Sequence, residues 1–527
     1  MLWLKRFMAG RRRQRRRRRG RQRAAQQPHN GSITKRKETP CQQDNQGDKR
    51  LKYSEPDLPE HMWWHIHSLL PLRDAARVAC VSRVFLRSWR CHPNLIFITE
   101  TLGLEPNAGR QRDRTRAFTS IVNHILKNHS GNGIKTLNLQ LYDYPDINPC
   151  DLNNWLQNAI KPWIEEITLG CIDCKYIKMY NFPCSLLFGE NGRSLRYLDI
   201  HGCAFRPTVG LRLRSLRQLC LYYVCITGDE LWCLLTNSFA LKELELSGCS
   251  EIICLKVPPL EQLSHLNVFS CKMLQMIEMT DSNISTFNFI GSLPQFSVGQ
   301  LSKVKDLDME CSNKSNFLFN AITRLPCVAP NVESLVLFSI SEMVDTPMVA
   351  AKFLHLKYLD ITLSDANFSP EYDYLSLVHF LDACPVLETF ILSILQERMK
   401  HVSVFGDASL PMRQMTEHKK HKSLKHVMML GFCSAKSLVE LTCCILEKAT
   451  SLECITLDTI NNWYSDESGI INRCSDTSNT RKCLPIGRKM ILEAHRALLA
   501  IERYIVGKVP SAVRLDVLRP CTRCHTV

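Results

Sequence analysis

Cysteine and histidine are the residue types in this sequence that first invite a chemical interpretation, because both can bind metals and cysteine can act as a nucleophile. The 527-residue chain has 25 cysteines and 17 histidines. Its string Cys521-x-x-Cys524-His525 has the spacing of a c-type haem attachment site. The chain lacks an apolar export segment at its start and a second ligand pair at zinc-site spacing. Chance or a packed terminal turn therefore explains the string better than haem or zinc.

Catalytic motifs are missing from the rest of the sequence. It contains no phosphate-binding loop, dinucleotide fingerprint, zinc-protease helix or nucleophile elbow. We therefore expect no catalytic residues, no metal and no cofactor, and a protein that binds other molecules without being an enzyme.

Positive charge gathers at the start of the chain. Residues 1–53 hold 18 lysines and arginines against three acidic residues, whereas the other 474 residues hold 49 against 48. The run at 11–23, RRRQRRRRRGRQR, repels itself and cannot form a core, so it predicts a disordered arm. An import receptor with an acidic groove is its expected partner; RNA affinity, a transit peptide and an erroneous gene start are alternatives. Nucleic-acid binding would belong to this arm alone, because the body is nearly neutral.

Length and hydropathy limit the cellular compartments in which this chain is expected. No stretch approaches the roughly 20 apolar residues of a membrane span, so we expect no contact with a membrane. The chain is also too long for a secreted disulfide scaffold. Free thiols in a reducing compartment, the nucleus and/or the cytoplasm, are the better expectation.

One short pattern, apolar-x-x-apolar-x-apolar, returns thirteen times. It starts at residues 134, 164, 195, 216, 241, 263, 284, 304, 332, 356, 387, 424 and 452. The mean spacing of about 26 residues is that of leucine-rich repeats, each a strand with a helical or irregular return. The pattern therefore predicts an α/β solenoid, a leucine-rich-repeat arc with a parallel sheet. Long late spacings leave room for helices such as 437–449.

Three cysteines take a fixed place in the repeats. Cys203, Cys249 and Cys271 each follow the last apolar position of a predicted strand by three residues. Leucine-rich repeats place asparagine or cysteine there, where a small buried side chain fits between neighbouring repeats. We expect buried thiols at these positions and not disulfide partners.

Acidic residues gather on one side of the predicted sheet. The residues that flank the two core positions of each strand must face the concave side. Among these 39 positions none is lysine or arginine, and nine are acidic: Glu166, Asp199, Glu243, Glu245, Asp306, Asp308, Glu310, Asp360 and Asp458. We predict an electronegative inner face that binds a basic segment of a protein target, through Glu243, Glu245, Asp306, Asp308, Glu310, Tyr222 and Phe269. Alternatively, the acids only keep an open sheet soluble.

Composition changes abruptly at residue 58, where LPEHMWWHIHSLLPLRDAARVACVSRVFLRSWRCHP begins. Apolar residues recur there at helical spacing, namely Met62, Ile66, Leu69 and Leu70 before Pro71, and Val81, Phe85 and Trp89 after it. The spacing predicts three short helices. These are too small to hold a core of their own, so they need a partner or the next domain.

Residues 58–93 resemble an F-box in their Leu-Pro opening, their Ile-His-Ser-Leu-Leu-Pro-Leu-Arg-Asp centre and their Val-Ser-Arg-x-Phe-x-x-x-Trp close. The resemblance implies that the helices bind the Skp-type adaptor of a cullin-RING ubiquitin ligase and, through it, the cullin and RING subunits. It assigns the contact, or its support, to Leu58, Pro59, Ile66, Leu69, Leu70, Val81 and Trp89. By periodicity alone, the segment equally fits a helical cap of the repeats.

The tail also has a helical apolar face, which would cap the last repeat. It is similar to the closing segment of plant F-box/LRR proteins of the FBD group. The expected domains are a disordered Arg-rich arm at 1–53, an F-box at 54–98, a linker or N-terminal cap at 99–133, repeats at 134–460, a polar loop at 461–482 and a C-terminal cap at 483–527.

These features together predict the substrate-recognition subunit of an SCF-type ubiquitin ligase, in which the F-box binds the adaptor and the repeats bind the target. One alternative is a repeat scaffold without a ligase. The other is a nuclear protein that binds nucleic acid through the arm.

Overall fold

The structure is a computed structural model that describes residues 59–104, 110–131, 133–144, 146–171, 179–279, 281–296, 301–311, 316–340, 342–364, 372–395, 401–406, 411–413, 420–460, 486–521 and 525. The predicted arm at 1–53, Leu58, the polar loop at 461–482 and Cys524 lie outside these residues. The chain divides into two units, Met1–Pro59 with Asn462–Leu484 and Glu60–Asn461 with Pro485–Val527. Every helix and strand named below belongs to the second unit.

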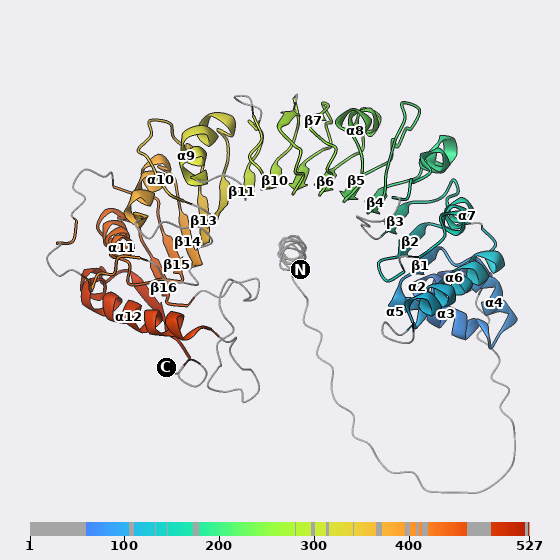
Figure 1. Cartoon of the computed structure of the whole chain (residues 1–527), viewed down its shortest axis with the longest axis horizontal. Helices are drawn as coiled ribbons and strands as arrows, with labels where there is room; N and C mark the ends of the chain where they lie inside the picture. Colours follow the sequence, from blue (N-terminus) through green and yellow to red (C-terminus); the bar gives the residue numbers. More distant parts are fainter. Residues whose placement is uncertain are drawn as a thin grey trace, which may run out of the picture. The chain divides into compact units, whose positions relative to one another are not determined.

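Fifteen strands form one parallel sheet in which they follow chain order (Figure 1). They are β1 (Asn94–Phe97), β2 (Thr136–Gln140), β3 (Glu166–Gly170), β4 (Tyr197–His201), β5 (Gln218–Tyr222), β6 (Glu243–Ser247), β8 (His265–Phe269), β10 (Thr286–Gly291), β11 (Asp306–Cys311), β12 (Ser334–Ser339), β13 (Tyr358–Ser364), β14 (Thr389–Leu395), β15 (His426–Leu430), β16 (Cys454–Asp458) and β17 (Arg514–Leu518). Two short strands, β7 (Cys254–Val257) and β9 (Met276–Met279), pair separately.

All thirteen predicted repeats supply one strand each, from β2 to β16, so the predicted solenoid is confirmed. The first and last strands of the sheet, β1 and β17, lie outside the thirteen predicted repeats. Where the other repeats begin with a large apolar residue, the polar His92 stands before β1 and the small Ala512 before β17. Both substitutions hide the pattern without preventing the strand, because the next two core positions remain apolar.

The core lies between the sheet and the outer elements of the repeats. In register, Leu198, Leu219, Leu244 and Leu266 are neighbours across four strands, and each is fully buried. Burying one such side chain contributes about 1.5–3 kcal/mol. Because every repeat adds the same positions, the stabilising contacts run along the whole sheet.

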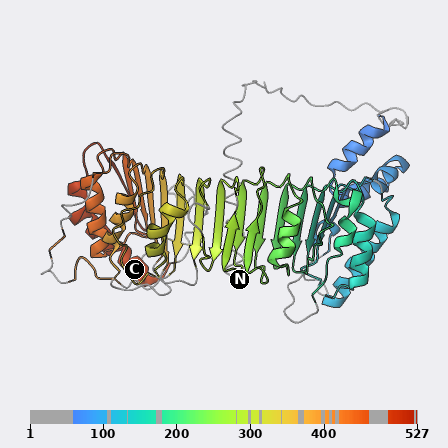
Figure 2. The ribbon, with the colours of Figure 1, turned by 90° about the horizontal axis from the view of Figure 1, so that it is seen from above.

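Helices cover the outer side of the sheet, and its inner side is lined by strands (Figure 1). Figure 2 shows the strands lying side by side along the unit. The helices are α5 (Thr99–Leu102), α6 (Gln111–Asn128), α7 (Pro149–Ala159), α8 (Gly228–Leu235), α9 (Phe317–Val328), α10 (Val378–Ala383), α11 (Lys436–Lys448) and α12 (Arg488–Tyr504), with 3-10 turns at Cys184–Leu187, Gly189–Gly192, Tyr374–Leu377 and Val506–Lys508. The helix predicted at 437–449 is α11.

The cysteines of the repeat pattern are buried as predicted. Cys203, Cys249 and Cys271 are buried free thiols. The Cys249 thiol donates a hydrogen bond to the carbonyl oxygen of Leu221 in the preceding repeat at 3.7 Å. Burial raises the pKa of Cys203 well above its usual value, which keeps that thiol protonated and unreactive.

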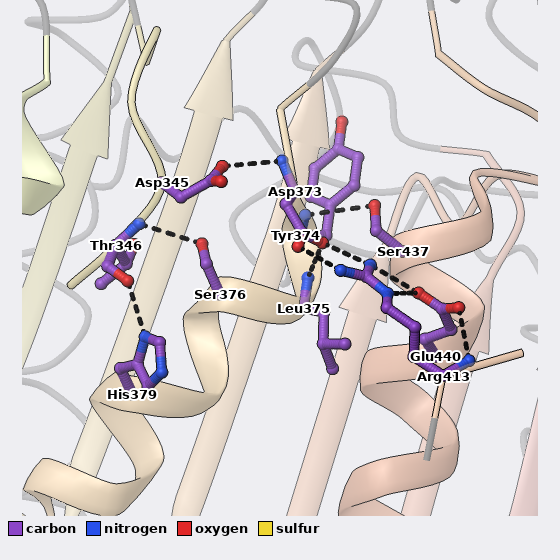
Figure 3. A network of polar contacts seen from close by, with 10 residues as sticks. All are labelled: Asp345, Thr346, Asp373, Tyr374, Leu375, Ser376, His379, Arg413, Ser437 and Glu440. Carbon is purple, nitrogen blue, oxygen red and sulfur yellow. Dashed lines mark hydrogen bonds and ion pairs between the residues drawn. The ribbon is translucent and has the colours of Figure 1, made fainter. Parts of the chain in front are cut away.

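A polar network fastens the outer segments of the later repeats (Figure 3). The guanidinium of Arg413 donates to Asp373 Oδ2 and Oδ1 at 2.6 and 2.8 Å and to Glu440 Oε2 at 2.7 Å. Its backbone N–H donates to Glu440 Oε1 at 2.9 Å. Because Asp373 opens the turn Tyr374–Leu377 and Glu440 lies in α11, one arginine joins three segments that are far apart in sequence.

The tail both covers the array and lengthens it. Helix α12 buries Ile491, Ala494 and Ile501, three residues of its predicted apolar face. Strand β17 then pairs with β16 as a further strand of the sheet. A buried ion pair between His401 Nε2 and Glu493 Oε1, 3.2 Å apart, ties α12 to the segment at 401–406.

Candidate functional site

Three short helices open the second unit, as the sequence predicts: α2 (Glu60–Leu69), α3 (Leu72–Ala79) and α4 (Arg83–Arg90). Pro71 separates the first two, and Ser82 starts the third by accepting a hydrogen bond from the N–H of Val84 at 3.2 Å. Between the helices the rings of His67 and Phe85 stack with their centroids 5.0 Å apart. Trp63 also packs edge-on against Phe85, with ring centroids 5.1 Å apart, and Leu72, Ala75 and Ala79 of α3 are buried.

Six large apolar side chains of this segment each expose more than a third of their surface. They are Met62, Trp64, Ile66, Leu69, Val81 and Leu86, with Leu69 and Val81 71% and 78% exposed. Single exposed apolar residues are normal, but a concentration within about 25 residues indicates a surface that a partner covers. We call these six residues the apolar hook.

The residues that the F-box resemblance singled out divide into two groups. Ile66, Leu69 and Val81 belong to the apolar hook, and Pro59 is also exposed. Leu70 and Trp89 are half-buried, and Trp89 packs against the hydrophobic core. The side chains of the first group are exposed and those of the second are partly covered, while Leu58 lies outside the described residues. Trp64 and Leu86 of the hook were not singled out in the sequence.

His92 joins the helices to the sheet. Its Nε2 donates to the carbonyl oxygen of Leu70 at 3.2 Å, and its Nδ1 accepts from the N–H of Asn94 in β1 at 3.1 Å. Burial lowers the pKa of His92, in keeping with the neutral ring that these two bonds require. The amide of Asn94 also donates to the carbonyl oxygen of Ser68 at 3.2 Å. The helical segment is therefore fixed to the first strand through hydrogen bonds.

The inner face consists of three rows of side chains. The first, third and fifth residues of each strand face it, as Tyr197, Asp199 and His201 do in β4, and the parallel register lines up equivalent positions. All nine acidic residues predicted for this face occupy these rows. The strand that the sequence search missed at the C-terminal end, β17, adds Arg514 and Asp516 to them.

The acidic side chains differ in depth. Glu243 and Glu245 on β6 are buried, whereas on β11 Asp308 is exposed and Asp306 and Glu310 are half-buried. Charge accessible to a partner is therefore concentrated at β11. The sequence pattern shows which side a residue faces but not how deeply its neighbours cover it.

Asp199 is already engaged within the inner face. It accepts hydrogen bonds from Tyr197 Oη at 2.9 Å and His201 Nε2 at 2.7 Å, and it is buried. Its carboxylate therefore organises neighbouring side chains on the same strand and offers little to a partner.

The seven residues predicted to bind a target do come together. Tyr222, Glu243, Glu245, Phe269, Asp306, Asp308 and Glu310 lie on β5, β6, β8 and β11, within a run of five neighbouring strands. Tyr222 is buried and Phe269 is half-buried. The most exposed of the seven is thus Asp308 on β11, with Asp306 and Glu310 half-buried beside it.

The part of the chain that the structure describes was predicted to lack metal sites and membrane spans. It contains no group of three metal-ligating side chains. None of its helices is long and apolar enough to cross a membrane. Cys521 and His525 are described, and the N–H of Cys521 donates to His525 Nδ1 at 3.3 Å.

A parallel-stranded solenoid with an exposed helical segment at its first strand is the architecture of a leucine-rich-repeat interaction protein. Residues 125–522, about three quarters of the chain, match the family described as "At1g61320/AtMIF1, LRR domain". The chain therefore belongs to this leucine-rich-repeat family.

Curated proteins of Arabidopsis thaliana are similar to parts of the chain. The putative F-box/LRR-repeat protein At3g49150 is 28% identical over 132 residues, which cover 25% of this chain and 20% of that protein. The putative F-box/FBD/LRR-repeat protein At3g49040 is 23% identical over 274 residues, 48% of this chain and 62% of that protein. F-box/LRR-repeat protein At5g02910 is 24% identical over 211 residues, 40% of this chain and 42% of that protein. The matches thus span from a fifth to about three fifths of these relatives, and the resemblance to plant F-box/LRR proteins is confirmed.

Proposed function

We propose that this chain is the substrate-recognition subunit of an SCF-type cullin-RING ubiquitin ligase. The apolar hook binds a Skp-type adaptor, and the inner face of the repeats binds the protein to be modified. The observation that carries the proposal is the exposure of six large apolar residues on a segment whose sequence follows the F-box order. Relatives named as F-box/LRR-repeat proteins support it.

The proposed mechanism is binding without catalysis by this chain. Holding the target beside a ligase converts ubiquitin transfer into an effectively intramolecular step. The cullin and RING subunits that supply the chemistry reach this chain through the adaptor. A rigid link between hook and inner face serves this role, because it sets the distance between the target and the ligase.

Localisation follows from the arm in this proposal. The arginine run at 11–23 is an import signal, and the protein acts in the nucleus, the cytoplasm or both.

Adaptor binding is tested by a pull-down with a purified Skp-type adaptor. Leu69→Asp and Val81→Asp each place a charge at a highly exposed position of the apolar hook, so the fold should tolerate them. We expect each change to weaken adaptor binding at least about tenfold, because burying one such side chain is worth roughly 1.5–3 kcal/mol.

Leu499→Asp is the matched control. Leu499 is 58% exposed on α12, away from the hook, so this variant should bind the adaptor like the parent chain. Full adaptor binding by both hook variants would contradict the proposal and favour a repeat scaffold without ligase coupling. The nucleic-acid alternative would instead be favoured if the chain binds nucleic acid in a salt-sensitive way and loses this binding when the arginines of residues 11–23 are replaced.

A further inference from the structure

A line of residues runs along the N-terminal edge of the sheet, one position before each strand. The backbone N–H of Arg196 donates to the carbonyl oxygen of Glu165 at 2.7 Å, that of Arg217 to Arg196 at 2.8 Å, and that of Lys242 to Arg217 at 2.8 Å. The same bond recurs at the following strands up to Glu453. These side chains therefore form a ladder with the strand spacing of about 4.8 Å.

Charges alternate at both ends of this ladder, and the uncharged Ser264 and Ser285 stand in it before β8 and β10. Lys135 and Arg196 both pair with Glu165, at 3.5 and 3.1 Å. Further along, Lys305 and Lys357 both pair with Glu333, at 3.0 and 3.7 Å. Alternation places opposite charges on neighbouring strands, which is the favourable arrangement for directly opposed side chains.

The alternation breaks at β4, β5 and β6. Arg196, Arg217 and Lys242 occupy three successive positions, and we call them the basic edge. All three are exposed, and among the described residues Arg217 and Lys242 have no ion-pair partner. The turn leading into β5 adds two more exposed cations, Arg212 and Arg214. Like charges on adjacent strands repel, so the fold itself gains nothing from this arrangement.

We propose that the basic edge is a docking row for an acidic α-helix of a partner protein. Two strand spacings separate its first and last residues, about 9.6 Å. Carboxylates at positions i and i+7 of a helix lie about 10.5 Å apart along its axis, whereas positions i and i+4 of an extended strand lie about 13 Å apart. Neighbouring carboxylates of a helical stripe are also about 5–6 Å apart, close to the spacing of the ladder. The match of spacing and charge identifies a helix with acidic residues at i, i+4 and i+7.

This row lies outside both the apolar hook and the inner-face rows. Failure of the docking-row proposal would therefore leave the adaptor and target proposals intact. Failure of those two proposals would likewise leave the docking-row proposal intact.

The test measures binding of a labelled acidic peptide by fluorescence anisotropy. The peptide is held helical by side-chain crosslinks, because short helices are marginal in water, and carries glutamates at i, i+4 and i+7. The protein is the full chain with the arginines of residues 11–23 changed to glutamine, since that arm would bind any acidic probe. A second helical peptide has the same composition with its glutamates scattered around the helix.

Two double variants of equal charge change are compared. Arg217→Gln with Lys242→Gln should weaken binding of the striped peptide about five- to tenfold, because two exposed charge contacts are lost together. Lys305→Gln with Lys357→Gln removes two cations from the alternating part of the ladder and should change binding less than about twofold. The scattered peptide should bind about fivefold more weakly than the striped one.

Three results would overturn the proposal. The first is equal weakening by both double variants, which would mean general electrostatic attraction. The second is no preference for the striped peptide, or no binding at all. The third is that a duplex DNA probe, and not the peptide, depends on Arg217 and Lys242, which would identify the row as a nucleic-acid contact.

Discussion

The carboxyl group of Glu342 is buried on the outer side of the repeats, beside the start of α9. Its Oε1 accepts hydrogen bonds from the N–H of Leu318 at 2.8 Å and from the Ser339 hydroxyl at 2.7 Å. Burial raises the pKa of Glu342 to about 7, because the two hydrogen bonds do not fully offset the loss of water. The group is therefore half-protonated near neutral pH.

Glu342 should make the fold less stable as pH rises. The folded carboxyl holds its proton up to about pH 7, whereas the unfolded one loses it near 4.3, so stability falls between these values and stays low above them. Glu342→Gln keeps an oxygen acceptor and removes the charge. We expect Glu342→Gln to raise the urea midpoint at about pH 8, which corresponds to an increase of up to about 3 kcal/mol in the free energy of unfolding. At about pH 4 the substitution should change the free energy of unfolding little.

Glu333→Gln is the control with the opposite sign. A hydrogen bond from Lys305 lowers the pKa of Glu333, so its charge is favourable and its removal should slightly destabilise the protein at about pH 8. Equal behaviour of the two variants across pH would contradict the assignment of a raised pKa to Glu342.

Arg413 acts at the scale of elements, because its hydrogen bonds hold a turn and a helix together. Glu440, its partner in α11, is buried, so losing the arginine leaves an uncompensated buried carboxylate. The neighbouring bond from the N–H of Tyr374 to Ser437 Oγ, at 3.2 Å, joins the same turn and helix (Figure 3).

Arg413→Ala should lower the opening free energy of α11 by about 2–3 kcal/mol, less than for a fully buried pair, because Glu440 is buried but Arg413 is 47% exposed. Hydrogen exchange of the α11 amides measures this opening locally, at the helix that Arg413 holds. Arg193→Ala, which breaks an exposed pair with Glu190, is the control and should cost at most about 1 kcal/mol. Unchanged α11 exchange in Arg413→Ala would show that the network does not hold these elements.

At the scale of the whole second unit, the apolar hook and the inner face are linked through β1. Strand β1 pairs with β2, and His92 and Asn94 beside it bind the backbone of the helical segment. The sheet then continues without a break in pairing to β17. One hydrogen-bonded sheet therefore connects the apolar hook to the proposed target face at β11.

Charge reversal on β11 tests the proposed target face. Proteins near the chain are identified by proximity labelling with a Leu69→Asp, Val81→Asp form, on which targets should accumulate because the ligase is uncoupled. Adding Asp306→Lys and Asp308→Lys should reduce labelling of these proteins about tenfold, since like charge would then meet a basic segment. Asp113→Lys with Glu502→Lys, an equal change at exposed positions outside the inner face, should leave labelling intact. Undiminished labelling after the β11 reversal would mean that the acids only keep the sheet soluble.

Thirteen strands were predictable from sequence, because each carries two or three apolar residues at fixed spacing and the repeat makes the signal additive. The strands at the two ends were not, since the polar His92 and the small Ala512 stand where the other repeats have a large apolar residue. His92 is acceptable there only because Leu70 and Asn94 satisfy its ring nitrogens, and those contacts span up to 22 residues. The side that a residue faces was likewise predictable, whereas the burial of Glu243 and the exposure of Asp308 were not.

The sequence by itself determined the solenoid, the three helices and the negative charge of the inner face. These follow from short apolar patterns and local composition, and the repeat pattern recurs many times along the chain. Only the tertiary structure decided which apolar residues of the three helices remain exposed and which acidic residues of the inner face are exposed to solvent. It also decided that Arg196, Arg217 and Lys242 stand in one row. These properties depend on neighbours that are 20 or more residues apart in the chain, and the register of the sheet alone brings such neighbours together.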